Sequence, residues 1–151
     1  SAAGIQVLHV TGAGKEFETS GIDPEVPYRV VSYADRMDLA LAVADLVVAR
    51  AGANTVCELT AVGLPAVYVP LPIGNGEQRV NAADVVSAGG GLLVQDAHVT
   101  PEWIDTTVVP LVRDRARLDA MAAAAAGAGR RDADLAMVEL IRTAVAAGGA
   151  L

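Results

Sequence analysis

Two residue types that commonly hold metals are nearly missing from this chain. It has one cysteine, Cys57, and two histidines, His9 and His98. A disulfide within the chain is therefore excluded, and we expect no metal site of cysteine and histidine ligands. So few cysteines are typical of a reducing, cytosolic compartment. Cys57 itself is predicted to lie on the buried side of a helix, as a small core residue.

Basic charge and long apolar segments are scarce as well. Eleven Lys and Arg stand against 18 Asp and Glu, which gives a formal net charge of −7. This balance argues against a nucleic-acid partner or a broad contact with anionic lipid, which would need clustered basic residues. No uninterrupted apolar run reaches the roughly 18 residues of a membrane span. A small anionic ligand remains compatible, because backbone amides at a helix N-terminus can bind phosphate.

Hydrophobic residues, in contrast, make up 53% of the chain, in short β-branched runs that alternate with helical stretches. Strands are predicted at 5–10, 29–32, 46–49, 66–69 and 92–94, and helices at 35–44, 55–62 and 78–88. A further helix should begin at Thr100, which precedes a proline, and two or three helices complete the chain. We expect one α/β domain over residues 1–151, a Rossmann-like open parallel sheet with flanking helices and a helical tail.

Ligands of such sheets bind at the carboxyl ends of the strands. Three loops qualify here, at residues 12–15, 50–54 and 70–77. A P-loop would need glycine where His9 stands and Ser or Thr where Glu16 stands, and no G-x-G-x-x-G follows a strand. A conventional nucleotide triphosphatase or a nicotinamide-dinucleotide enzyme is therefore disfavoured.

The segment RAGANTVCELTAVGLPAVYVP, residues 50–70, places three polar side chains in an apolar context. Its glycine turn leads into a helix whose first free amides would point at a ligand in the cleft. Glu58 lies one turn into that helix, where it could accept hydrogen bonds from a ribose diol. The alternative is a capping box of Thr55 and Glu58, which needs no ligand. Arg50 also has an alternative, as a strand-end residue paired with a nearby acid.

A second candidate segment is PLPIGNGEQRVNA, residues 70–82. It puts Glu77 and Gln78 at a helix N-terminus, where one carboxylate and one amide would suit neighbouring sugar hydroxyls. The alternative is a flexible turn followed by residues that favour the start of a helix. No nucleophile–base pair can be assembled from the chain, so no catalytic residue is predicted in it.

Taken together, residues 50–82 resemble the donor-binding half of the MurG family, the N-acetylglucosaminyltransferases that convert lipid I to lipid II in peptidoglycan synthesis. The similarity also includes residues 9–14, 32–48 and 88–94, and so covers most of residues 5–100. An Arg-x-Gly-Ala-x-Thr-x-x-Glu run followed by Gly-Asn-Gly-Glu-Gln is much more specific for the family than either piece alone.

The resemblance implies the C-terminal domain of a GT-B glycosyltransferase, which binds UDP-N-acetylglucosamine for an inverting transfer without cofactor or metal. Glu58 would bind the ribose, residues 52–55 the diphosphate and sugar, residues 77–78 the N-acetylglucosamine, and residues 33–34 the uracil. The full set of implied donor-binding residues is Tyr33, Ala34, Arg50, Gly52, Ala53, Asn54, Thr55, Glu58, Glu77 and Gln78.

Three positions depart from the family pattern: Ala51 stands where Ser is usual, Ile73 where a polar residue is common, and Ala13 where Lys is frequent. In the family, the acceptor site for lipid I, the proposed catalytic base and the membrane contact belong to an N-terminal domain. We therefore expect this chain to be inactive by itself, and the full enzyme to be peripheral on the cytoplasmic face of the bacterial plasma membrane. The alternatives are the UDP-sugar domain of another GT-B enzyme, with a glycolipid or natural-product acceptor, or a non-catalytic nucleotide-sugar-binding module.

Overall fold

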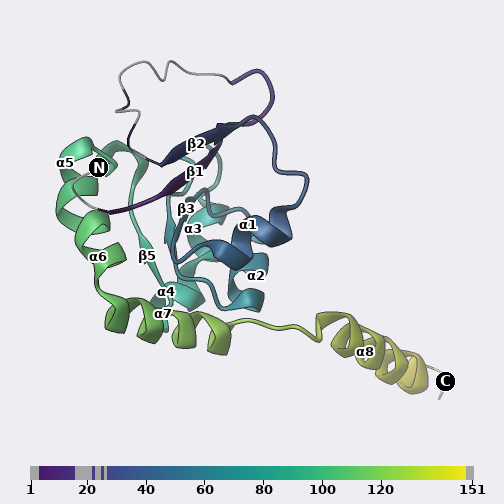
Figure 1. Ribbon diagram of the computed structural model, residues 1–151. Helices are drawn as coiled ribbons and strands as arrows, with labels where there is room; N and C mark the ends of the chain where they lie inside the picture. Colours follow the sequence, from purple (N-terminus) through teal and green to yellow (C-terminus); the bar gives the residue numbers. More distant parts are fainter. Residues whose placement is uncertain (1–3, 16–21, 23–24, 26, 149–151) are drawn as a thin grey trace.

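Parallel strands form the centre of the molecule (Figure 1). The computed structural model describes residues 4–15, 22, 25 and 27–148. One ladder pairs β1 (Val7–Val10) with β2 (Tyr28–Val31), and a second has the order β3 (Val47–Ala49), β4 (Ala66–Tyr68), β5 (Gly91–Leu93). Every pairing is parallel, as the alternation of strands and helices predicts. The expected single sheet is divided, however, since no ladder joins β1 to β3 in the described part of the chain.

Helices cover the strands and follow them to residue 148. They are α1 (Met37–Val43), α2 (Ala53–Val62), α3 (Glu77–Asn81), α4 (Ala83–Ser87), α5 (Pro101–Trp103), α6 (Val109–Arg113), α7 (Arg115–Ala128) and α8 (Ala133–Gly148), with a 3-10 turn η1 (Asp96–His98) and a π-helical turn η2 (Ile104–Val108). The predicted cap at Thr100 is confirmed, because its Oγ1 accepts a hydrogen bond from the Trp103 amide at 3.1 Å. The helix expected over 78–88 is instead two helices that meet at Ala82.

The segment η2 interrupts regular α-helical hydrogen bonding just before a proline. Pro110 follows at the start of α6 and has no amide hydrogen to donate to the preceding turn. A π-helical turn is one way for a helix to accommodate this loss. The run from α5 to α6 therefore stays helical although its hydrogen-bond pattern changes.

The core lies on both sides of β4, whose three residues are fully buried. On one side Tyr68 packs in a cluster with Leu59 of α2 and Ala125 of α7. On the other side Val67 packs with Val94 and Trp103. A central parallel strand covered on both faces is apolar throughout, which explains the uninterrupted apolar run in this part of the sequence.

The helix α2 differs from its prediction at its start and in one side chain. It begins at Ala53, two residues before the predicted Thr55, and it ends as predicted at Gly63, a left-handed residue with φ 70°. Cys57 is exposed, so its assignment to the core is wrong. The buried positions of α2 include Val56, and the next residue points about 100° away around a helix.

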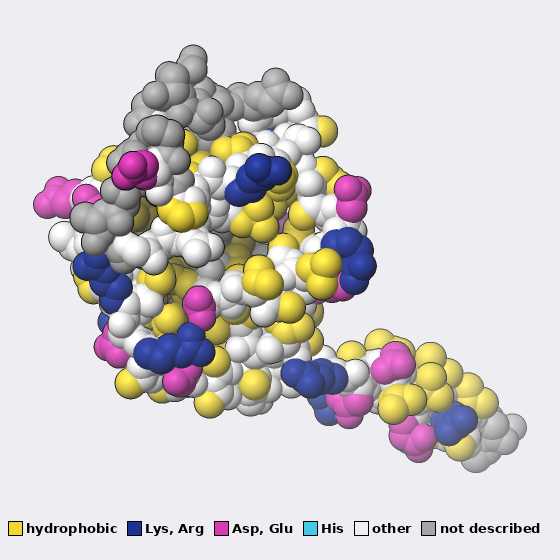
Figure 2. Space-filling model, viewed as in Figure 1, with side chains coloured by type: hydrophobic (Ala, Val, Ile, Leu, Met, Phe, Trp, Pro, Cys, Tyr) yellow, Lys and Arg dark blue, Asp and Glu magenta, His cyan; other side chains and the backbone are white. Residues whose placement is uncertain are grey.

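The last helix extends away from the rest of the molecule (Figure 1). Its start is held in place, since Arg131 Nε donates to the Ala61 carbonyl at 2.5 Å. Beyond that point α8 contributes no buried residue, and its apolar side chains are visible on its surface in Figure 2. The large exposed ones are Leu135, Met137, Val138, Leu140, Ile141 and Val145. None of the helices in the described residues is both long and apolar enough to cross a membrane.

Candidate functional site

The N-terminus of α2 is the part of the predicted site that the strand–turn–helix geometry defines best. Gly52 is the N-cap residue and has extended backbone angles, φ −63° and ψ 148°. The first hydrogen bond of the helix runs from the Val56 amide to the Gly52 carbonyl at 3.0 Å. The amides of Ala53, Asn54 and Thr55 therefore precede the first bonded turn and have no partner inside the helix. Such amides, with the helix dipole behind them, attract an anion.

The capping box that we considered for Thr55 and Glu58 is wrong. No side chain caps α2, and both residues lie inside the helix rather than at the positions that a capping box requires. The reason is that Gly52, with no side chain, already occupies the N-cap position. Glu58 is thus left one turn into α2 without the structural role that was its main alternative.

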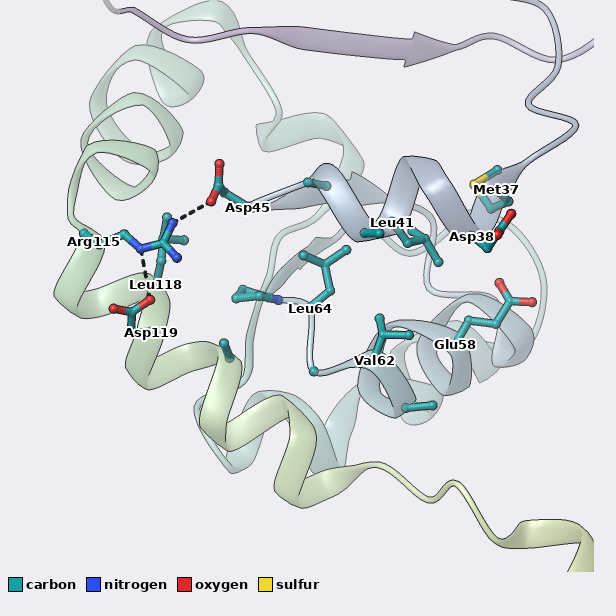
Figure 3. Close-up of a pocket in the computed structure, with 16 residues that line it drawn as sticks. Met37, Asp38, Leu41, Asp45, Glu58, Val62, Leu64, Arg115, Leu118 and Asp119 are labelled. Atoms are coloured by element: carbon teal, nitrogen blue, oxygen red, sulfur yellow. Dashed lines mark hydrogen bonds and ion pairs between the residues drawn. The ribbon is translucent and has the colours of Figure 1, made fainter.

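Glu58 lines one end of a groove of about 630 Å³ between α1, α2 and α7 (Figure 3). Met37 and Asp38, at the start of α1, lie across from it, while Leu41, Leu64 and Leu118 contribute apolar lining farther along. Because Arg36 forms a hydrogen-bonded ion pair with Asp38 at 2.6 Å, the pKa of Asp38 is lowered from its ordinary value. Of the predicted site residues, only Glu58 lines this groove.

The opposite end of the groove is lined by an ion-pair cluster. Arg115, at the start of α7, contacts Asp45 at 2.6 Å and Asp119 at 3.1 Å, as the dashed lines in Figure 3 indicate. Its hydrogen bond to Asp45 is the main reason that the pKa of Arg115 is raised. All three side chains are largely exposed, and they connect the loop after α1 to α7. This end of the groove is thus a surface contact between the loop after α1 and α7.

Arg50 bridges the carboxyl ends of neighbouring strands. Its Nη1 donates to the carbonyls of Val69 and Pro70, both at 3.3 Å, and forms an ion pair with Asp96 at 2.6 Å. The alternative considered for Arg50, pairing with a nearby acid, is therefore present in the structure. Its side chain is still 48% exposed. Since these contacts all use Nη1, the N–H donors of Nε and Nη2 are left for a ligand.

The loop after β4 holds Glu77 and Gln78 at the start of α3. The Leu71 amide donates to Gln78 Oε1 at 3.0 Å, and the Glu77 amide donates to Asn75 Oδ1 at 3.2 Å. Gln78 is partly buried and Glu77 is exposed. These bonds fix the loop on the start of the helix and leave the Gln78 amide nitrogen and the Glu77 carboxylate available.

Two residues that sequence reasoning missed connect these segments. Asn81 Nδ2 donates to the Ala51 carbonyl at 3.1 Å, so α3 is joined to the turn before α2. Asp96 is the acid that pairs with Arg50. A signal for Asn81 was its position one helical turn after Gln78, on the same face of the helix. The signal for Asp96 was its place just after the last predicted strand.

The remaining predicted residues, Tyr33 and Ala34, follow β2 and precede α1. Tyr33 is 72% exposed, and Ala34 is partly buried. The structure brings Arg50, the turn at 52–55 and the start of α3 together through the contacts of Arg50 and Asn81. It shows no such bond for Tyr33 or Ala34 in the part of the chain that is described. The described residues also contain no group of three or more His, Cys, Asp and Glu side chains that could hold a metal ion.

Comparison with known proteins identifies the family of this chain. Residues 1–137 match the profile of the glycosyltransferase family 28 C-terminal domain. The chain is 58% identical over 146 residues to a protein of Leifsonia xyli subsp. xyli, and 57% identical over 148 residues to one of Streptomyces collinus. Both relatives are named UDP-N-acetylglucosamine--N-acetylmuramyl-(pentapeptide) pyrophosphoryl-undecaprenol N-acetylglucosamine transferase. The matches cover 96% and 95% of this chain but 40% of each relative.

Solved structures give the same result for the fold. The crystal structure of Acinetobacter baumannii MurG matches 91% of this chain with a TM-score of 0.82 at 30% identity. The match spans 40% of the MurG chain. The glycotransferase of kitacinnamycin matches 87% of this chain and 34% of its own length, with a TM-score of 0.63 at 26% identity. The predicted α/β fold is therefore confirmed, and the chain spans about 40% of the length of these curated relatives.

Proposed function

This chain belongs to the glycosyltransferase family 28 C-terminal domain family, as its resemblance to MurG predicted, and on that premise we propose that it binds UDP-N-acetylglucosamine. It would serve as the donor domain of an enzyme that transfers N-acetylglucosamine to lipid I. The support is the activity after which two relatives, 55% and 58% identical to this chain, are named. Binding of lipid I, the catalytic base and contact with the cytoplasmic face of the membrane are assigned to parts of the enzyme outside this chain.

The main support from the structure is the order of polar groups along the first turns of α2. Three amides without a helical partner are followed by Glu58 at the next turn. A helix rises about 1.5 Å per residue, so the carboxylate lies roughly one turn from the amides. That spacing is comparable to the separation of a ribose diol from its 5′-phosphate. The diphosphate would bind the amides and the helix dipole, and Glu58 would accept hydrogen bonds from the diol.

The sugar and the base are assigned to the two neighbouring loops. The Gln78 amide oxygen is engaged by the Leu71 amide, so its nitrogen would donate to a sugar hydroxyl while the Glu77 carboxylate accepts from another. Tyr33 and Ala34 would lie against the uracil. In the transfer, the α2 amides would stabilise the negative charge that develops on the departing UDP. With this polarised helix end and Arg50 beside the diphosphate, the proposal needs neither a metal nor a cofactor.

An NMR titration of the chain with UDP-N-acetylglucosamine tests the proposal. We expect saturable shifts at residues 33–35, 52–58 and 77–78. Glu58→Ala should weaken binding about 10- to 100-fold, because hydrogen bonds to a charged group contribute about 1.5–3 kcal/mol. Glu102→Ala, an exposed glutamate on α5, is the matched control and should bind as the wild type does.

Two results would count against this function. An equal response to ADP-glucose would show that the uracil is not recognised. Unchanged binding by Glu58→Ala would show that the carboxylate does not contact the ribose. A stronger response to UDP-glucose than to the N-acetylated sugar would favour a related transferase with a different donor.

A further inference from the structure

The contacts of Arg50 assign a role to an acid that is not part of the predicted site. We propose that Asp96 is a positioning residue, which holds the Arg50 guanidinium across the strand ends so that its unused N–H groups face the donor diphosphate. This inference rests on the proposed function, because it concerns the same binding site. It adds a residue, Asp96, that would act on the ligand through Arg50 rather than by contact.

Arg50 reaches across the ends of several strands. The residue follows β3, its carbonyl acceptors Val69 and Pro70 follow β4, and Asp96 begins η1, shortly after β5. One guanidinium nitrogen thus contacts groups at the carboxyl ends of all three strands of this ladder. In parallel sheets these ends form the ligand-binding edge, so the guanidinium lies where a phosphate would bind.

The contacts of Arg50 differ in length and in kind. The two bonds to carbonyls measure 3.3 Å, beyond the usual range for an N–H···O bond, while the contact with Asp96 measures 2.6 Å. The contact with Asp96 is an ion pair, whereas the hydrogen bonds of Nη1 go to the two carbonyls, so Asp96 holds this end of the guanidinium in place by charge. Both side chains are partly open to solvent, at 48% and 41% exposed, and such pairs contribute little to folding stability. We therefore assign the pair a role in orienting Arg50 and not in folding stability.

The Arg50–Asp96 pair also changes the charge at the strand ends. An ion pair is neutral overall, so Asp96 offsets the attraction that a free Arg50 would exert on a diphosphate. Within the pair, the donors on Nε and Nη2 still point in a fixed direction. Their fork geometry matches the oxygens of a phosphate. The chain as a whole is acidic, with a net charge of −7, so directed donors matter more here than general attraction. Positioning and simple electrostatics therefore predict different effects for substitutions of Asp96.

The test compares Asp96→Ala and Asp96→Asn by NMR titration with UDP and with uridine. Ordering one long side chain on binding weakens affinity by about three- to tenfold, and we expect this loss for UDP in Asp96→Ala. Asp96→Asn keeps the size of the side chain but removes the charge of the ion pair, so positioning predicts a similar loss, whereas simple electrostatics predicts tighter binding of UDP. Uridine has no phosphate, and its binding should be unchanged in both variants.

Two further variants sharpen the comparison. In an Arg50→Ala background, Asp96→Ala should have no additional effect on UDP binding, because Asp96 acts through the guanidinium. Asp105→Ala, which removes an exposed acid from η2, is the matched control and should leave UDP binding unchanged. The side-chain Nε–H signal of Arg50 should change in both the free Asp96→Ala and the free Asp96→Asn chains, because each substitution removes the ion pair.

The outcomes separate this inference from the function on which it rests. If the wild-type chain does not respond to UDP, the proposed function fails and the inference fails with it. If the wild type responds and Asp96→Ala binds UDP equally well or more tightly, only the inference is overturned. An equal loss for UDP and uridine would also overturn it, since the substitution would then act by disturbing the site as a whole.

Discussion

The hydroxyl of Tyr68 is a buried polar group without a hydrogen-bond partner among the described residues. The side chain is fully buried in β4, at the centre of the core. Its ring packs directly on Gly91 of β5, where an added Cβ would lie 2.7 Å from Tyr68 Cε2. Replacing Tyr68 with Phe keeps this ring in place and removes only the oxygen. We therefore predict that Tyr68→Phe stabilises the protein.

The magnitude follows from the cost of burying a hydroxyl without a partner. Mutational data place this cost at about 1–3 kcal/mol, and the small void left by one oxygen reduces the gain. We expect the free energy of unfolding to rise by about 1–2 kcal/mol. For a domain of this size, that corresponds to an increase in Tm of about 2–8 °C.

The size of the effect also depends on pH in a defined way. Burial raises the pKa of Tyr68 above its ordinary value of 10.0. A folded pKa above the unfolded one gives stability that is complete below pH 10 and is lost as the pH rises through the folded value. The variant has no such ionisation, so its advantage over the wild type should widen above pH 10.

Urea unfolding followed by circular dichroism measures these differences, and Tyr28→Phe is the matched control. The Tyr28 hydroxyl lies 2.8 Å from His9 Nδ1, so its removal should cost about 0.5–1.5 kcal/mol, the opposite sign. A Tyr68→Phe variant that is less stable than the wild type would refute the reasoning, because the hydroxyl would then have a favourable partner.

Two other predictions concern the packing of the helices. Gly90→Ala should cost about 1–3 kcal/mol by thermal unfolding, because the new Cβ would lie 2.6 Å from the backbone of Ala125. Gly127→Ala should not destabilise the protein, because the new Cβ would meet no described atom within 4 Å outside the adjacent backbone of α7, and alanine is favoured in a helix. Ending the chain after Asp132 removes α8, which buries no residue, so Tm should change by less than about 4 °C, roughly 1 kcal/mol. A larger fall in Tm would show that α8 packs on the rest of the chain.

Local chemistry explains why much of the fold could be predicted. Thr100 before a proline specifies a helix start through neighbouring atoms alone, and Gly63 ends α2 in a conformation that favours glycine. The apolar run of β4 predicts a strand covered on both faces. Each signal lies within a few residues of the feature that it specifies, so it can be read without the rest of the structure.

The two errors in α2 concern features that local sequence signals do not specify. Thr55 and Glu58 have the spacing of a capping box. That spacing does not indicate whether the helix already starts at a glycine three residues earlier. The exposure of Cys57 depends on which side of α2 meets the core, and a shift of one residue rotates a side chain by about 100°. Both features needed the packing of α2 against its neighbours.

By itself, the sequence determined the alternation of parallel strands and helices, the family resemblance and the loops that form the candidate site. Those properties follow from local hydrophobic pattern and from motifs of adjacent residues. Only the tertiary structure decided the partners of Arg50 and the bond between Asn81 and Ala51. These contacts join residues that are distant in the chain, and they exist because parallel strands place their carboxyl ends side by side.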